Sequence, residues 1–86
     1  MNLFFDKMKK INRLAEVFLK KDIYNREIAK LLNKSEQTIS KWTNNHRQPS
    51  LEDLYTIAEH LQIDIRELLY QSDWSESKVE ELDKKK

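Results

Sequence analysis

The polar residues between Ser35 and Trp42 have the types and spacing of a hydrogen-bonding surface. Ile39 and Trp42 are three residues apart, so on a helix they face one side and leave the polar side chains on the other. A glutamine can pair bidentately with adenine, a lysine can donate to the acceptors of guanine, and a threonine methyl can touch thymine. The residues that could make such contacts with base edges or phosphates are Glu36, Gln37, Thr38, Ser40 and Lys41.

The apolar residues predict the helices that position this face. The chain has no glycine and no sustained alternation of apolar and polar residues, which argues against strands and hairpins. Apolar residues instead recur three and four positions apart, as in Phe4, Met8, Ile11, Ala15 and Phe18. The pattern predicts an all-α chain with five helices, over residues 3–21, 25–32, 36–44, 51–61 and 65–71.

Polar residues at the predicted helix boundaries favour the same division. Three of them precede a helix and can accept hydrogen bonds from its first N–H groups, namely Ser35, Ser50 and Asp64. In a chain without glycine, asparagine is the next best residue for a left-handed helix end. Asn33 and the pair Asn44 and Asn45 stand where two helices end, so a structural role is open for each of them.

The link between the second and third helices is the shortest in the chain. Only Asn33 and Lys34 separate residues 25–32 from residues 36–44, and so short a link forces a sharp angle between the two helices. Ala29 is small enough to let them approach closely, and Trp42 would anchor the third helix to the core. The side chains expected to fill the angle are Ile28, Leu32 and Ile39.

Residues 11–69 resemble the phage repressor/Cro-type helix-turn-helix family of bacterial regulators, the XRE family. The segment NREIAKLLNKSEQTISKW follows the motif's pattern of apolar, small and turn residues. The following RQPSLEDLYTIAEHLQIDIRELL resembles the family's next segment, a basic-Pro-Ser loop, an amphipathic helix and a short helix that begins at Asp64. The resemblance implies a compact five-helix, lambda-repressor-like DNA-binding domain over residues 1–71, whose third helix enters the major groove of double-stranded DNA.

The resemblance also implies which residues touch DNA. Family positions that read bases correspond to Asn25, Glu36, Gln37, Ser40 and Lys41, and family positions that contact phosphates to Asn25, Arg26, Asn44, Asn45, His46 and Arg47. Tyr24 stands where the family usually has a capping Ser or Thr, so Asn25 is either a cap or a reader. Glu36 either accepts from a cytosine amine, caps locally or repels the phosphates.

Composition limits the other functions. The formal net charge is +1, but residues 1–50 hold eleven Lys and Arg against five acids, so we expect this half to face a polyanion if one is bound. There is no cysteine, no apolar run of membrane-spanning length and no glycine to shape a phosphate loop. His46 and His60 are too far apart in sequence to suggest zinc. We therefore expect a cytoplasmic protein that is not an enzyme, with no cofactor, metal, membrane or small-molecule substrate.

Residues 72–86 leave two structural alternatives. Asp73 or Ser75 could begin a short sixth helix carrying Trp74, Val79 and Leu82, or the segment could be a tail with Trp74 against the fifth helix. Leu69, Tyr70 and Trp74 would form an apolar patch, and we expect a homodimer through the fifth helix and the tail, with the LFF run at residues 3–5 as the rival surface. The favoured function is a sequence-specific transcriptional regulator, most simply a repressor. The alternative is a protein-interaction module, such as an antitoxin-like or adaptor subunit.

Overall fold

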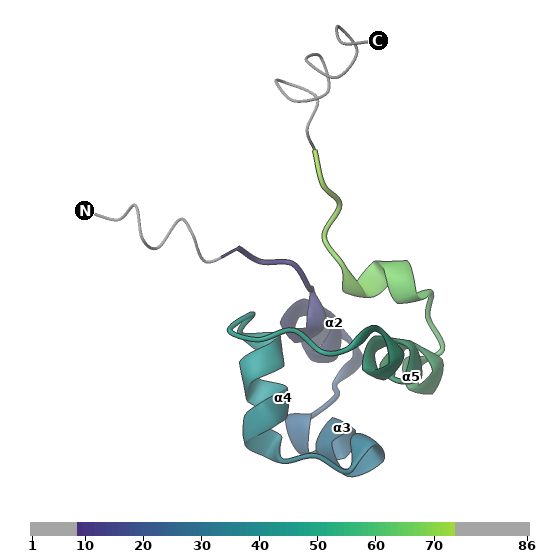
Figure 1. Ribbon diagram of the computed structural model, residues 1–86. Coiled ribbons are helices and arrows are strands. Elements are labelled where there is room, and N and C mark those ends of the chain that lie inside the picture. Colours follow the sequence, from purple (N-terminus) through teal and green to yellow (C-terminus); the bar gives the residue numbers. More distant parts are fainter. Residues whose placement is uncertain (1–8, 74–86) are drawn as a thin grey trace, which may run out of the picture.

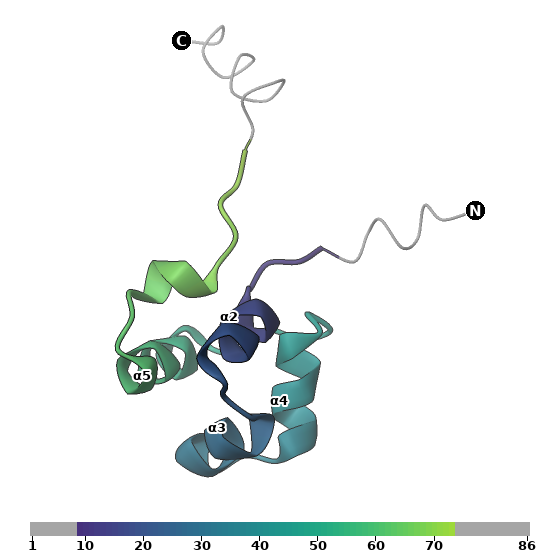
Figure 2. The same cartoon turned by 180° about the vertical axis from the view of Figure 1, so that it is seen from behind.

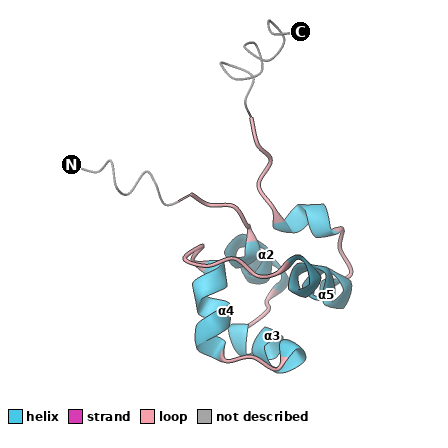
Figure 3. Cartoon of the chain, viewed as in Figure 1, coloured by secondary structure: helices cyan, strands magenta, loops and turns pink. Residues whose placement is uncertain are grey.

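The computed structural model describes residues 9–73 and places four α-helices and one 3-10 helix in that part of the chain (Figures 1 and 3). The elements are α2 (Leu14–Lys21), α3 (Asn25–Leu32), α4 (Glu36–Thr43), α5 (Leu51–Leu61) and η1 (Ile65–Leu68). The all-α class is confirmed, while the fifth predicted helix is a short 3-10 turn that gives way to extended chain at Leu69. None of these helices is long and apolar enough to cross a membrane. The proposed sixth helix lies outside the described residues.

The first helix is shorter than the sequence pattern predicts. It begins at Leu14 rather than at residue 3, and residues 9–13 are not helical. Arg13 N–H donates to the Leu68 carbonyl at 2.7 Å and Tyr70 N–H donates to the Ile11 carbonyl at 3.0 Å. These bonds make an isolated antiparallel bridge, which takes the backbone groups that a longer helix would use. Ile11 is consequently 50% exposed, and Phe4 and Met8 lie outside the described residues.

The core lies where α2, α3, α4 and α5 meet. The predicted inward residues Ile28, Ile39 and Trp42 are buried, with Trp42 only 5% exposed. Leu51 and Tyr55 fit the apolar spacing of α5 but remain on its surface, because the buried side of that helix is already filled by neighbouring residues. The buried apolar side chains are Leu14, Val17, Phe18, Ile28, Ala29, Ile39, Trp42, Leu54, Ile57, Ala58, Leu61 and Leu68.

Each α-helix of the described part is followed by a residue with positive φ, although glycine is absent. The prediction is confirmed for Asn33 and Asn45, with φ of 57° and 61°, and is wrong for Asn44, whose φ is −89°. Asp22 and Gln62 also have positive φ, at the ends of α2 and α5. In all four places the next N–H bonds to a carbonyl five residues back, the pattern of the Schellman motif.

The helix starts follow the predicted capping chemistry at three places. Ser35 Oγ accepts from Thr38 N–H at 3.1 Å, and Ser50 Oγ accepts from Asp53 N–H at 3.0 Å. Asp64 Oδ1 accepts from Arg66 N–H at 2.8 Å before η1. α4 and α5 are therefore fixed at both ends, which sets where their outward side chains stand, whereas α2 and α3 begin without a side-chain cap.

Candidate nucleic-acid interface

The turn between α3 and α4 directs one face of α4 away from the protein. Asn33 is left-handed, and Lys34 N–H bonds back to the Ala29 carbonyl at 2.8 Å, so α3 ends here and the chain turns sharply into α4. Ile28 and Ile39 are fully buried in the angle between the helices. α4 lies at one edge of the helical body, on the side opposite α5, and the loop after it runs from that edge across to α5 (Figures 1 and 2). The two helices have the helix-turn-helix arrangement.

The outward face of α4 carries the residues that the sequence singled out. Glu36, Gln37 and Lys41 are exposed, whereas Thr38 and Ser40 are half-buried. Thr38 Oγ1 lies 3.0 Å from Ser35 Oγ, so the threonine belongs to the cap at the start of the helix. The three exposed side chains make no hydrogen bond within residues 9–73 and are open to a partner.

The start of α3 lies beside this face and contributes a cation. Tyr24 is the N-cap residue and its side chain makes no capping bond, which leaves the first N–H groups of α3 without a side-chain acceptor. Asn25 is the first helical residue and not the cap. The Arg26 guanidinium stacks over the Tyr24 ring at 5.0 Å, a cation–π contact that limits where the charge can move. The sequence pattern marked Tyr24 only as a departure from the family, and its contact with Arg26 was not predicted.

Glu36 shares a surface hollow between α3 and α4 with three cations and a second acid. The charged residues that line the hollow are Arg26, Glu27, Lys30, Lys34 and Glu36. Ser35 already caps α4 through its hydroxyl, so a local capping role for Glu36 is not supported. The cations outnumber the carboxylates by one, so the formal charge of the hollow is positive despite Glu36.

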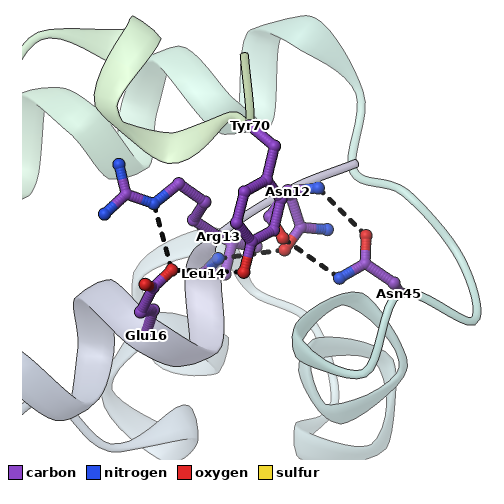
Figure 4. Close-up of polar contacts among 6 residues, drawn as sticks. All are labelled: Asn12, Arg13, Leu14, Glu16, Asn45 and Tyr70. Carbon is purple, nitrogen blue, oxygen red and sulfur yellow. Dashed lines mark hydrogen bonds and ion pairs between the residues drawn. The ribbon is translucent and has the colours of Figure 1, made fainter. Parts of the chain in front are cut away.

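The predicted phosphate-binding residues of the loop after α4 fall into two groups. Asn44, His46 and Arg47 are exposed, and their side chains make no hydrogen bond within the described part of the chain. The Asn45 side chain is turned inward instead. Its Oδ1 accepts from Ile11 N–H at 2.8 Å. The same oxygen accepts from Asn12 N–H at 3.0 Å, and Asn45 Nδ2 donates to the Asn12 carbonyl at 3.1 Å (Figure 4). Asn45 therefore shapes the loop.

Asn12 is the principal residue that the sequence analysis missed. It is 2% exposed, and it is the one buried polar side chain among residues 9–73. Its Nδ2 donates to the Trp42 carbonyl at 2.9 Å and to Gln48 Oε1 at 2.7 Å, while its Oδ1 accepts from Leu14 N–H at 3.0 Å. The only sequence signal was a polar residue beside an apolar stretch, and the predicted long helix assigned it no contact.

A second polar cluster holds the bridge at residues 11–13 against the end of η1. Arg13 Nε donates to Glu16 Oε1 at 3.0 Å, and the Tyr70 hydroxyl donates to the same oxygen at 3.2 Å (Figure 4). The Arg13 hydrogen bond lowers the pKa of Glu16. Partial burial and the bond to Glu16 raise the pKa of Tyr70. The cluster fixes the extended segment from the side opposite to the Asn45 loop.

The histidines take different places. His46 is exposed in the loop after α4. His60 is on α5, and its Nε2 lies 2.9 Å from Glu27 Oε2 on α3. Within residues 9–73 no three His, Asp or Glu side chains gather in a way that would hold a metal ion.

Comparison with known proteins identifies the fold. The family described as helix-turn-helix matches residues 9–68. A solved protein from Bacteroides fragilis, provisionally described as DNA-binding, is 43% identical with a TM-score of 0.68 and covers 70% of this chain and 97% of its own. A transcriptional regulator from Listeria innocua shares the fold at 21% identity and a TM-score of 0.63, over 90% of this chain and 77% of its own. No curated protein matches the sequence. The chain belongs to the XRE-type helix-turn-helix family.

Proposed function

We propose that the protein is a sequence-specific regulator of transcription that binds double-stranded DNA and reads the major groove with α4. The observation that carries the proposal is the division of α4 into a buried side, Ile39 and Trp42, and an exposed side that is free of internal hydrogen bonds. A helix fits the major groove, and the side chains on that exposed side have the donors and acceptors that base edges require. Glu36, Gln37 and Lys41 are the proposed central readers, with Asn25, Thr38 and Ser40 at the margin.

Phosphate contacts are proposed at both ends of the reading helix. Arg26 and the uncapped start of α3 lie on one side, and Asn44, His46 and Arg47 lie in the loop on the other. Cations and free backbone N–H groups are the usual partners of phosphate oxygens, and they set the orientation of a protein on the duplex. The Asn45 side chain is left out of this set because its amide is already bonded to Asn12.

The regulatory outcome that we propose is repression by occlusion, in which the bound protein blocks polymerase from the same duplex. We also propose that two copies bind together, since helix-turn-helix proteins commonly occupy half-sites about one helical turn apart. Exposed apolar side chains on α5, Leu51 at 73% and Tyr55 at 62%, support a contact between copies. Sedimentation that finds a monomer alone at tens of micromolar would remove the dimer from the proposal.

Selection of bound sites from a pool of random duplexes tests the function directly. We expect an enriched motif, a palindrome if two copies bind, and an affinity that falls steeply with salt because counterions are released from the phosphates. A scrambled duplex of equal length serves as the control. Equal affinity for the enriched and scrambled duplexes would overturn sequence-specific reading. Absence of duplex binding at low salt would favour the protein-interaction module instead.

A further inference from the structure

Three amide side chains form a closed hydrogen-bonded ring beneath the loop after α4. Asn12 Nδ2 donates to Gln48 Oε1 at 2.7 Å, and Gln48 Nε2 donates to Asn45 Oδ1 at 3.1 Å. Asn45 closes the ring through its two bonds with the Asn12 backbone, at 3.0 and 3.1 Å. The ring joins the segment before α2 to both ends of the loop that contains His46 and Arg47.

The burial of Asn12 determines how the ring can act on DNA binding. Asn12 is 2% exposed, so it cannot touch a duplex, yet it holds the Trp42 carbonyl near the end of α4 at 2.9 Å. No buried polar side-chain atom in the described residues lacks a partner, so each bond here replaces one that water would have made. Losing the partners of the buried Asn12 would leave its polar groups unsatisfied, which favours a single loop conformation over alternatives, whereas Gln48 is exposed and can bond to water.

We infer that Asn12, Asn45 and Gln48 are positioning residues for DNA binding, and the inference rests on the proposed function. In the DNA-free protein they fix the end of the reading helix and the conformation of the proposed phosphate-binding loop. A loop that is already ordered does not lose that conformational freedom on binding, so affinity is higher for the same contacts. No member of the ring contributes a charge, and the number of phosphates neutralised does not depend on it.

The substitution Asn45→Gly separates the contribution of the hydrogen-bonded ring from the contribution of the turn's backbone conformation. Glycine adopts the left-handed conformation that Asn45 holds at φ 61°, so the variant keeps the turn and loses only the amide. Asn33→Gly is the matched control, because Asn33 has φ 57° and its side chain makes no hydrogen bond within residues 9–73. We expect Asn45→Gly to weaken duplex binding by about 5- to 30-fold, the factor for ordering roughly one residue of backbone. The salt slope and the preferred motif should not change.

A measurement without DNA tests the ring independently of the proposed function. The amide hydrogens of Ile11 and Asn12 donate to Asn45 Oδ1, so they should exchange slowly in the wild type and at least tenfold faster in Asn45→Gly. Asn33→Gly should leave both exchange rates and affinity unchanged. Gln48→Ala, which removes one exposed member, should show a smaller effect of the same kind on both measurements.

The outcomes are distinct. Weaker binding by Asn45→Gly with unchanged exchange at Ile11 and Asn12 would mean that Asn45 touches the duplex, and would overturn the positioning role. Faster exchange with unchanged affinity would overturn it as well, since the ring would then serve stability alone. A wild-type protein with protected amides that binds no duplex would refute the proposed function and leave the ring as a structural feature.

Discussion

Asn45 bonds to Asn12 as one peptide group bonds to another, its side-chain oxygen accepting the Asn12 N–H and its side-chain nitrogen donating to the Asn12 carbonyl (Figure 4). The two residues are 33 positions apart. The segment at residues 9–13 therefore has a partner on each side, the loop after α4 through Asn45 and the end of η1 through the bridge to Leu69. This arrangement explains why the chain before Leu14 is not helical.

The left-handed residue after α5 predicts a stabilising substitution. Positive φ costs a residue with a Cβ roughly 1–2 kcal/mol, a cost that glycine avoids. Glycine has more conformational freedom in the unfolded chain, and losing it on folding offsets about half of this gain. Gln62→Gly also loses the bond from Nε2 to the Glu59 carbonyl at 2.8 Å. Because that bond is exposed to solvent, its loss should cost at most about 0.5 kcal/mol, and we expect a net gain of up to about 0.5 kcal/mol in the free energy of unfolding, measured by urea denaturation.

Glu59→Gly provides the control for that substitution. It places the same residue inside α5, where glycine should cost about 1 kcal/mol. If both variants were destabilised equally, strain at Gln62 would not be a significant part of the stability of this helix end.

Local chemistry made much of this fold predictable, and long-range polar contacts made the rest unpredictable. The turn at Asn33, the caps at Ser35 and Ser50, and the burial of Trp42 follow from neighbours in sequence. The end of the first helix was predicted correctly at residue 21, but its start was not, because spacing alone cannot show that residues 11–13 bond to residues 68–70.

The same distinction applies to the candidate interface. The exposed face of α4, which carries the proposed readers, could be predicted because two buried neighbours, Ile39 and Trp42, fix the orientation of the helix. Asn45 could not be separated from Asn44, His46 and Arg47, since only the fold turns its amide toward Asn12. The contribution of Tyr24 to holding Arg26 likewise depends on a ring orientation that the sequence does not specify.

The lowered pKa of Glu16 predicts a dependence of stability on pH. Since Arg13 lowers this pKa in the folded protein, the carboxylate adds stability above the ordinary value of 4.5 and loses it as pH falls through the folded value. Glu16→Gln should melt below the wild type at pH 7, and the difference in Tm should shrink below pH 4.5. The pair is exposed, so added salt should reduce the difference too.

Glu59→Gln removes the same charge on α5, where the carboxylate has no hydrogen bond within residues 9–73. Its Tm should stay close to that of the wild type at both pH values. A constant gap between Glu16→Gln and the wild type from pH 7 to pH 3 would contradict the assignment of this pKa shift to the Arg13 contact.

Arg47→Ala tests the proposed phosphate grip. The side chain is exposed in the loop after α4, and its loss should weaken binding to every duplex by a similar factor. The slope of log affinity against log salt should fall by about one unit, since one fewer phosphate is neutralised. Arg66→Ala is the charge-matched control, because Arg66 is paired with Asp64 at η1. An unchanged slope for Arg47→Ala would exclude this arginine as a phosphate contact.

Gln37→Ala tests whether α4 reads bases. Gln37 is exposed near the start of α4 and has no internal partner within the described residues, so its amide is free to pair with one base edge. We expect a loss of about 1–3 kcal/mol on the selected motif, with relaxed preference at a single position and little change on scrambled duplex. Gln71→Ala, an exposed glutamine beyond η1, should bind as the wild type does. If Gln37→Ala lowered binding to the selected and scrambled duplexes alike, the amide would be a backbone contact and the reading element would have to be sought elsewhere.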